Sequence, residues 1–268
     1  MKIAIFIDCQ NDFLKGGKLA YCYPEKDNFE NVINLAKQCV ENGYICLATL
    51  DTHIATQYDD QKNPVDGYLT TLEGKNLPIE HCIVDTFGWK MNEDLHKVLD
   101  GHCTYLRKST FGSRMMIHRI AEAARTKGVE EILICGYCTS ICVLSNAVLL
   151  RARLPNTKIT VVESCCGDVS KESHEAAITT LKMQQIDVVN NVTLEKQNQK
   201  IFEVEFIDNS HHYANSFGFT MAASIEEAEN NVIKYFENLN RYPEGITVKT
   251  ITEWYEGLPG RNLPCTLL

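Results

Sequence analysis

The chain has 268 residues, 44% hydrophobic and 23% charged, and its 26 basic and 35 acidic residues give a formal net charge of −9. This composition excludes a disordered, collagen-like or coiled-coil chain, and the acidic balance argues against a nucleic-acid partner, because phosphate binding depends on clustered Lys and Arg. The apolar runs are far shorter than the roughly 20 residues of a membrane helix, and no signal-peptide pattern precedes the first strand-like run, so we expect a cytoplasmic protein without a membrane partner.

Strand-like and helix-like patterns alternate up to about residue 190. The expected strands are 2–8, 44–50, 103–107, 131–136, 158–163 and 186–190. The expected helices are 27–42, 92–99, 114–127, 141–152 and 172–183, the first of them opened by Asp27 and Glu30 in capping-box spacing. This alternation predicts an α/β fold with a doubly wound, mostly parallel sheet and helices on both faces. The unperiodic segment 51–90 has a length that is usually functional in a compact domain.

The pattern changes after residue 190. Residues 191–200 are polar and unperiodic, which indicates a linker. Two strand-like runs follow, then a helix opened by Ser224 with Glu227 in capping-box register, then a last strand-like run over 246–255. We therefore expect a main domain of residues 1–195 and a small β-β-α-β accessory domain of residues 200–268, to which the sequence assigns no role.

Reactive side chains follow successive strands of the expected sheet. Asp8 follows the first strand, Asp51 and His53 the second, Lys108 the third, and Cys142 comes shortly after the fourth. Ligands of open parallel sheets bind outside the carboxyl ends of the strands. We therefore expect these side chains to meet at one site.

Cys142 is the candidate nucleophile. It lies near the start of an expected helix, where the helix dipole and free N–H groups favour a thiolate. Asp8 can accept the thiol proton, Lys108 can hold the charged pair, and the backbone N–H groups of Cys138 and Cys142 can face a developing oxyanion. The alternative is that Cys142 is a small buried residue. Other cysteines fit that description in a reducing compartment, among them Cys39, Cys46, Cys103 and Cys135.

Five motifs give the chain a resemblance to the isochorismatase-like cysteine hydrolases, and among these to nicotinamidases. In chain order they are IFIDCQNDFLKGG, LDTH, LPIEHCIVDTFGW, RKSTFGS and ICGYCTSICVLSNA. The resemblance covers roughly residues 2–190 and implies that the main domain is a cysteine hydrolase domain with the isochorismatase-like fold. It implies hydrolysis of a small-molecule amide, foremost nicotinamide to nicotinate and ammonia in NAD salvage.

The resemblance also implies a catalytic mechanism. Asp8, Lys108 and Cys142 are the expected triad, with Asp8 as the base. A cis peptide bond before Cys138 is expected to let the N–H groups of Cys138 and Cys142 form the oxyanion hole. A homo-oligomer is expected as well.

A metal site and a substrate pocket are implied in the same way. Asp51, His53 and His81 are expected to bind a divalent metal that holds the pyridine nitrogen, zinc first and iron or manganese as alternatives. The substrate-binding residues are expected to be Phe13, Leu77 and Tyr137. Some relatives carry a third metal histidine soon after the first, and here the nearby residues are Asp59 and Asp60.

Several alternatives remain open. Cys135 and Cys138 form a C-x-x-C sequence that a redox pair would also show, and Cys142 would add a third ligand for a metal cluster. Within the hydrolases, a ureide or carbamoyl substrate of the carbamoylsarcosine, ureidoacrylate or biuret type is the second choice. A binding protein without catalysis is the third.

Overall fold

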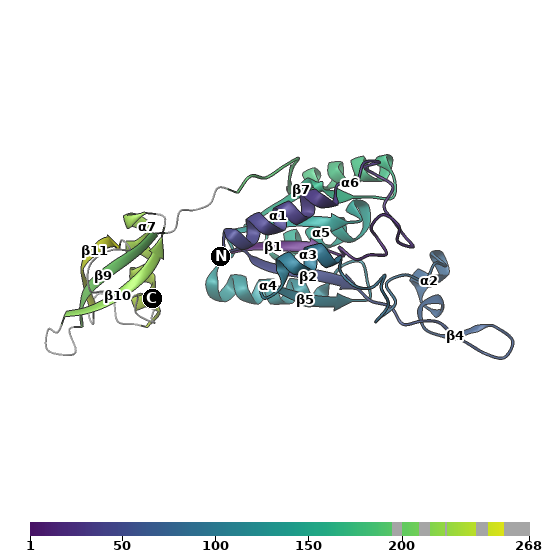
Figure 1. Cartoon of the computed structure of the whole chain (residues 1–268), viewed down its shortest axis with the longest axis horizontal. Helices are drawn as coiled ribbons and strands as arrows, with labels where there is room; N and C mark the ends of the chain where they lie inside the picture. The colour runs from purple at the N-terminus through teal and green to yellow at the C-terminus, as the bar shows by residue number, and fades with distance from the viewer. Residues whose placement is uncertain (195–199, 209–214, 223, 240–245, 255–268) are drawn as a thin grey trace. The chain divides into compact units, whose positions relative to one another are not determined.

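The computed structural model describes residues 1–194, 200–208, 215–222, 224–239 and 246–254 (Figure 1). The chain divides into two compact units, Met1–Glu195 and Lys196–Leu268. Residues 195–199 of the expected linker lie outside the described residues. None of the described helices is long and apolar enough to cross a membrane.

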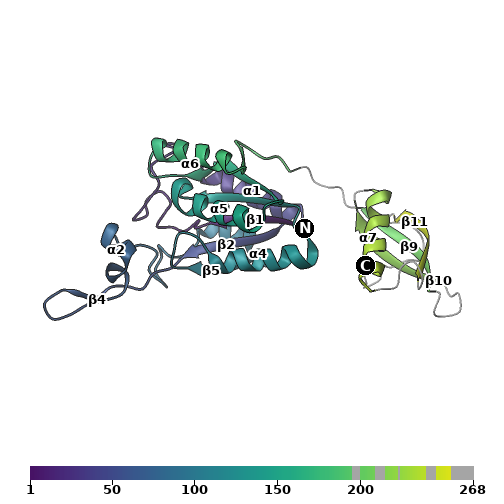
Figure 2. The ribbon, with the colours of Figure 1, turned by 180° about the vertical axis from the view of Figure 1, so that it is seen from behind.

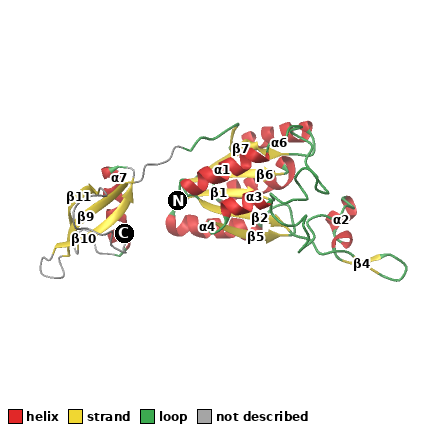
Figure 3. Ribbon diagram, viewed as in Figure 1, coloured by secondary structure: helices red, strands yellow, loops and turns green. Residues whose placement is uncertain are grey.

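The first unit is built on a six-stranded sheet in the order β5-β2-β1-β6-β7-β8, in which all neighbouring strands are parallel. The strands are β1 (Lys2–Ile7), β2 (Ile45–Asp51), β5 (Cys103–Lys108), β6 (Glu131–Tyr137), β7 (Lys158–Gly167) and β8 (Asp187–Val189). The apolar strands β1 and β6 are central and buried, as runs of β-branched residues predict for a sheet covered on both faces. The expected fold class is confirmed (Figure 3).

Helices cover both faces of this sheet. On one face α1 (Phe29–Glu41) packs beside α3 (Glu93–Leu99), and on the other α4 (Arg114–Lys127), α5 (Leu144–Arg153) and α6 (Lys171–Met183) form a row (Figures 1 and 2). The capping box expected at Asp27 is absent, because the residue before α1 is Asn28 and its side chain makes no cap bond. The carboxylate of Asp27 accepts the N–H of Phe29 instead, at 2.9 Å.

The segment expected to be irregular, 51–90, contains short elements of its own. A hairpin of β3 (Gln57–Tyr58) and β4 (Pro64–Asp66) is followed by a 3-10 turn (Tyr68–Thr70) and by α2 (Leu72–Asn76), which project beyond the carboxyl ends of the strands in Figure 1. Thr71 caps α2 by accepting the N–H of Gly74 at 3.0 Å. The hydroxyl of the buried Tyr68 donates a hydrogen bond to the carbonyl oxygen of Leu77 at 2.9 Å. This bond links the 3-10 turn to the residue that follows α2.

The second unit has the expected β-β-α-β order. It consists of β9 (Lys200–Asp208), β10 (Asn215–Ala222), α7 (Ile225–Asn238) and β11 (Ile246–Trp254), and its antiparallel sheet has the order β10-β9-β11. Ser224 caps α7 by accepting the N–H of Glu227 at 3.2 Å, in the expected register. Val204, Val232 and Phe236 form a small buried core between helix and sheet.

Candidate active site

An ion pair and a thiol lie together beyond the carboxyl ends of strands β1, β5 and β6. Lys108, the last residue of β5, places Nζ 2.6 Å from Oδ2 of Asp8 and 3.6 Å from Sγ of Cys142. All three residues are buried: Asp8 is 0% exposed, Lys108 7% and Cys142 6%. A buried ion pair of this kind needs good geometry to offset the cost of desolvation.

Asp8 is held in place from the neighbouring strand. The hydroxyl of Thr49 in β2 donates to Oδ1 of Asp8 at 2.7 Å, and the N–H of Asp8 lies 3.1 Å from the same hydroxyl oxygen. Burial raises the pKa of Asp8, although the charge of Lys108 opposes that rise. A carboxylate with a raised pKa is suited to taking up a proton.

The local structure around Cys142 differs from the expected helix start. Cys142 lies in a π-helical turn (Thr139–Val143), and the regular helix α5 begins after it, at Leu144. Burial raises the pKa of Cys142 well above its ordinary value, and this outweighs the lowering effect of Lys108. The regular helix therefore starts later than expected, and burial opposes the thiolate that a helix start at Cys142 would favour.

The peptide bond between Tyr137 and Cys138 is cis, as expected. The ring of Tyr137 is fully buried, stacks on Tyr21 with centroids 4.9 Å apart, and donates its hydroxyl to Oδ1 of Asn28 at 3.2 Å. This side chain belongs to the core, and it is not among the residues that line the cavity described next. The substrate-binding role expected for Tyr137 therefore disagrees with its position.

A cavity of about 240 Å³ opens in front of the thiol. Cys138 and Cys142 form one part of its lining, and Asp51 and His81 form another. Its apolar wall includes Phe13 and Leu77, which were expected there, and Phe111, which was not. The cavity is therefore mainly apolar, with the Cys142 thiol and a set of polar groups in its wall, as small-molecule sites typically are.

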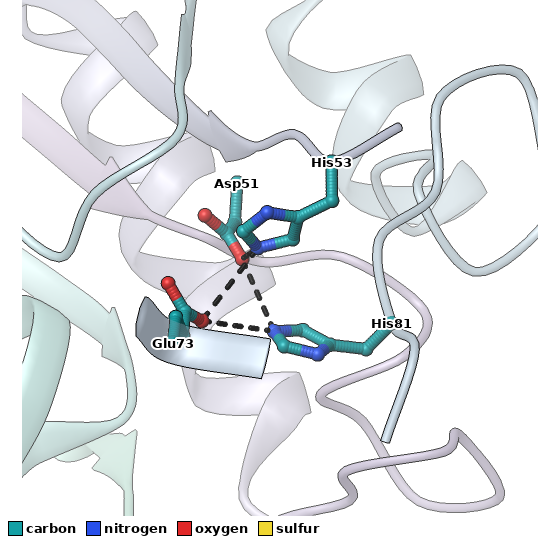
Figure 4. A group of neighbouring side chains, drawn as sticks. All are labelled: Asp51, His53, Glu73 and His81. Atoms are coloured by element: carbon teal, nitrogen blue, oxygen red, sulfur yellow. Dashed lines mark hydrogen bonds and ion pairs between the residues drawn. The ribbon is translucent and has the colours of Figure 1, made fainter. Parts of the chain in front are cut away.

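Three polar residues of this wall, Asp51, Glu73 and His81, form a group of four possible metal ligands with His53, which does not line the cavity (Figure 4). We call these four residues the metal group. One atom each from Asp51, His53, Glu73 and His81 lies within 4.8 Å of all the others. Oδ2 of Asp51 is 2.9 Å from Nε2 of His53 and 3.3 Å from Nε2 of His81. Oε1 of Glu73 is 3.7 Å and 3.6 Å from the same two nitrogens. Two imidazoles and two carboxylates fit zinc, iron or manganese.

Hydrogen bonds to neighbouring groups orient the possible ligand atoms toward one another. Nδ1 of His81 donates to the carbonyl of Ile79 at 2.9 Å, which turns its Nε2 toward the group. Oδ2 of Asp12 accepts the N–H of Cys82 at 2.7 Å, which ties the chain next to His81 to the loop after β1. The carbonyl of Cys82 accepts the N–H of His53 at 3.0 Å.

Asp51 lies between the other possible metal ligands and Lys108 of the expected triad. Its Oδ1 lies 3.4 Å from Nζ of Lys108, whereas its Oδ2 faces the histidines. Although burial raises the pKa of Asp51, hydrogen bonds from His53 and His81 hold that pKa far below its ordinary value. The side chain of Gln10 fixes the backbone of Asp51 by accepting its N–H at 2.7 Å and donating to its carbonyl at 2.8 Å.

Glu73 was missed by the sequence analysis. Asp59 is exposed and binds Asn63 within its own hairpin, at 2.8 Å from the N–H, and it is not part of the metal group. Glu73 reaches the group from α2, a helix of five residues inside the segment 51–90. No periodic pattern marks so short a helix, so the sequence offered no signal for this residue.

The eleven cysteines of the described residues are free thiols. Cys135 is buried within β6 and makes no disulfide with Cys138, unlike an oxidised redox pair. The metal-capable group found in the described part of the chain contains no cysteine. The structure therefore gives the redox and cysteine-cluster alternatives no support.

Two curated relatives match most of the first unit. An isochorismatase family protein of Bacillus subtilis, PncA, is 27% identical over 183 residues, covering 66% of this chain and 92% of the relative. The nicotinamidase of Escherichia coli is 24% identical over 199 residues, covering 67% of this chain and 89% of the relative.

Solved structures show the same fold. The nicotinamidase/pyrazinamidase PncA of Bacillus subtilis superposes with a TM-score of 0.58 at 23% identity, over 70% of this chain and 99% of the other. A pyrazinamidase of Pyrococcus horikoshii in complex with zinc has a TM-score of 0.53 at 20% identity, over 70% of this chain and 98% of the other. The isochorismatase domain family matches residues 2–194. The chain therefore belongs to the isochorismatase family and is an isochorismatase-like hydrolase.

Proposed function

We propose that the chain is a cysteine-dependent amidohydrolase that converts nicotinamide to nicotinate and ammonia through a thioester on Cys142. The observation that carries this proposal is a single cavity of about 240 Å³ whose wall holds the Cys142 thiol and three of the four possible metal ligands, namely Asp51, Glu73 and His81. A ring amide can lie in it with its carboxamide carbon at the sulfur and its ring nitrogen at the metal group. The relatives named nicotinamidase support the same substrate.

The residues that would hold a divalent metal are Asp51, His53, Glu73 and His81, and their donor atoms fit zinc first, with iron or manganese as alternatives. A metal bound there supplies a Lewis acid that holds the pyridine nitrogen of the substrate. The zinc complex of the Pyrococcus horikoshii pyrazinamidase supports zinc as the first candidate.

The acylation step follows from the contacts of Cys142. Its sulfur attacks the carboxamide carbon while the thiol proton passes to Asp8, which Lys108 holds at 2.6 Å. The oxygen of the tetrahedral intermediate faces the backbone N–H groups of Cys138 and Cys142. Asp8 then returns the proton to the leaving nitrogen, the C–N bond breaks, and ammonia departs from a thioester.

The deacylation step uses the same groups in reverse. A water attacks the thioester carbon and gives a proton to Asp8. The C–S bond breaks, the carboxylic acid leaves as nicotinate, and the sulfur is reprotonated. Two easier displacements replace one difficult displacement, which is the benefit of a covalent intermediate.

A comparison of amides tests the substrate. Nicotinamide and benzamide have the same shape, but benzamide lacks the ring nitrogen, so we expect kcat/KM for ammonia release to be at least about 100-fold higher for nicotinamide, as for a site built to bind a polar group. Equal values would contradict the role of the metal group in binding the ring. Faster release from an N-carbamoyl compound would favour the ureide alternative.

The metal group is tested by binding rather than by turnover. We expect His81→Ala to lower zinc affinity by more than about 10- to 100-fold, the usual loss when only a residue behind a ligand is changed, because it removes one of the buried nitrogen ligands themselves. Competition with a chromophoric chelator measures this affinity. His118→Ala, at an exposed histidine of α4, is the control and should bind zinc as the unaltered protein does. Equal affinity in both variants would exclude His81 as a ligand.

We assign this activity to the domain of residues 1–195, since every residue of the site lies there. The described residues of the domain 200–268 are not among them. A homo-oligomer remains a prediction. If the folded, metal-loaded protein released no ammonia from any amide or ureide tested, a binding role would be favoured instead.

A further inference from the structure

Asp168 is a fully buried carboxylate that the proposed chemistry does not use. It follows the last residue of β7 and is 0% exposed. Its Oδ2 accepts the backbone N–H of Ser140 at 2.9 Å, and its Oδ1 accepts the hydroxyl of Ser140 at 2.8 Å and the N–H of Val169 at 2.8 Å. Two of its three hydrogen bonds therefore go to a single residue.

Ser140 stands between the two residues whose N–H groups are assigned to the oxyanion. Cys138, Ile141 and Cys142 line the cavity, whereas Ser140 does not. The N–H of Ser140 is bound to Asp168. The neighbouring hydroxyl of Thr139 donates to the carbonyl of Gly167 at 3.1 Å. The turn is thus attached to the end of β7 at two successive residues.

Asp168 is itself held rigidly by its backbone. Its carbonyl accepts the N–H groups of Cys22 and Tyr23, both at 2.9 Å, and its own N–H donates to the carbonyl of Tyr23 at 2.7 Å. These bonds do not involve the carboxylate. A substitution of the Asp168 side chain therefore removes the attachment of Ser140 and leaves the backbone of this segment paired.

Hydrogen bonds to a carboxylate are roughly twice as strong as those between neutral groups, and two of them fix both the position and the rotation of the Ser140 peptide. N–H donors stabilise an oxyanion only when they are already aimed at it, because reorientation during the reaction would cost the energy they supply. We propose that Asp168 is a positioning residue, which holds the turn through Ser140 so that the N–H groups of Cys138 and Cys142 face the oxyanion. This inference rests on the proposed function.

The test compares a ligand that forms a tetrahedral adduct with Cys142 and a ligand that stays planar. Nicotinaldehyde forms a hemithioacetal, in which Cys142 Sγ bonds to the aldehyde carbon and the thiol proton goes to the former carbonyl oxygen, which then occupies the oxyanion position. Nicotinate stays planar and makes no such bond. We expect Asp168→Ala to lower kcat and the affinity for nicotinaldehyde by about 10- to 100-fold, with KM and the nicotinate Kd changed less than about threefold.

Two further variants keep the test decisive. Ser140→Ala keeps the N–H bond to Asp168 and loses the hydroxyl bond, so we expect a smaller loss, about threefold. Asp168→Asn is nearly isosteric and replaces the alanine variant if that variant does not fold. Its amide oxygen can accept only some of the three hydrogen bonds that the carboxylate accepts. We therefore expect smaller losses of kcat and of nicotinaldehyde affinity, again with KM and the nicotinate Kd nearly unchanged.

The outcomes distinguish this inference from the proposed function. An unaltered protein that releases no ammonia from nicotinamide contradicts the proposed function, whereas the binding of nicotinaldehyde and nicotinate needs no turnover and still tests Asp168. A folded Asp168→Ala variant with unchanged nicotinaldehyde affinity overturns the positioning role. An equal loss of affinity for nicotinate and nicotinaldehyde would also overturn it, because that result indicates a general loosening of the cavity.

Discussion

The Cys142→Ala variant is expected to lose ammonia release from nicotinamide by about 10⁵-fold or more, because removal of the nucleophile of a catalytic triad costs about 10⁶-fold in kcat where it has been measured. The fold should survive. The change deletes one buried sulfur atom, and a loss of about 1 kcal/mol would lower the melting temperature by about 2–4 °C in a domain of this size. Steady-state ammonia release and thermal melting measure the two effects.

Cys135→Ala is the matched control for this variant. Both thiols are buried, but Cys135 lies within β6 and does not line the cavity. We expect the control to keep its activity, and mass spectrometry of the acid-quenched unaltered protein should find a nicotinoyl group on the Cys142 peptide. Activity that persists in Cys142→Ala, or is lost in Cys135→Ala, would contradict the nucleophile assignment.

The Asp8→Asn variant is expected to lower kcat by about 10²- to 10⁴-fold, the usual contribution of a general base. Its stability should fall as well. Nζ of Lys108 loses the carboxylate at 2.6 Å and keeps Asp51 at 3.4 Å. Breaking a buried ion pair on one side costs about 3–5 kcal/mol, and the amide oxygen of the new side chain should reduce that cost. Chemical denaturation and kcat are measured on the same preparation.

A double variant separates catalysis from stability in this pair. Asp8→Asn combined with Lys108→Met removes both charges, so that no unpaired ammonium remains next to the amide. We expect the free energy of unfolding to recover relative to Asp8→Asn alone, and the activity to stay lost. Recovery of both quantities would show that Asp8 acts through stability and not as the base.

The fold was largely predictable because local signals agreed with the overall pattern. The expected helix 114–127 matches α4 at both ends, since Ser113 caps it and Gly128 follows it with a positive φ of 71°. The helix expected over 141–152 begins later, at Leu144. A π-helical turn depends on the packing around Cys142 and has no periodic signature in the sequence.

The candidate site was predictable where residues follow strands, and less so elsewhere. Asp8, Lys108 and Cys142 come together because parallel strands end at one edge. The same rule would have pointed to Asp168, but the expected strand 158–163 stopped before the end of β7 at Gly167. The substrate-binding role expected for Tyr137 disagrees with its position because Tyr137 is the last residue of β6, where successive side chains point to opposite faces of the sheet. Its side chain points into the core and does not line the cavity.

The size of the cavity also limits which amides fit beside the Cys142 thiol. Its volume of about 240 Å³ is below the roughly 300–1,000 Å³ of pockets for drug-sized molecules, and Cys142 is 6% exposed. We therefore expect small free amides to reach the thiol more readily than the asparagine and glutamine side chains of folded proteins, whose amide groups carry a polypeptide chain behind them.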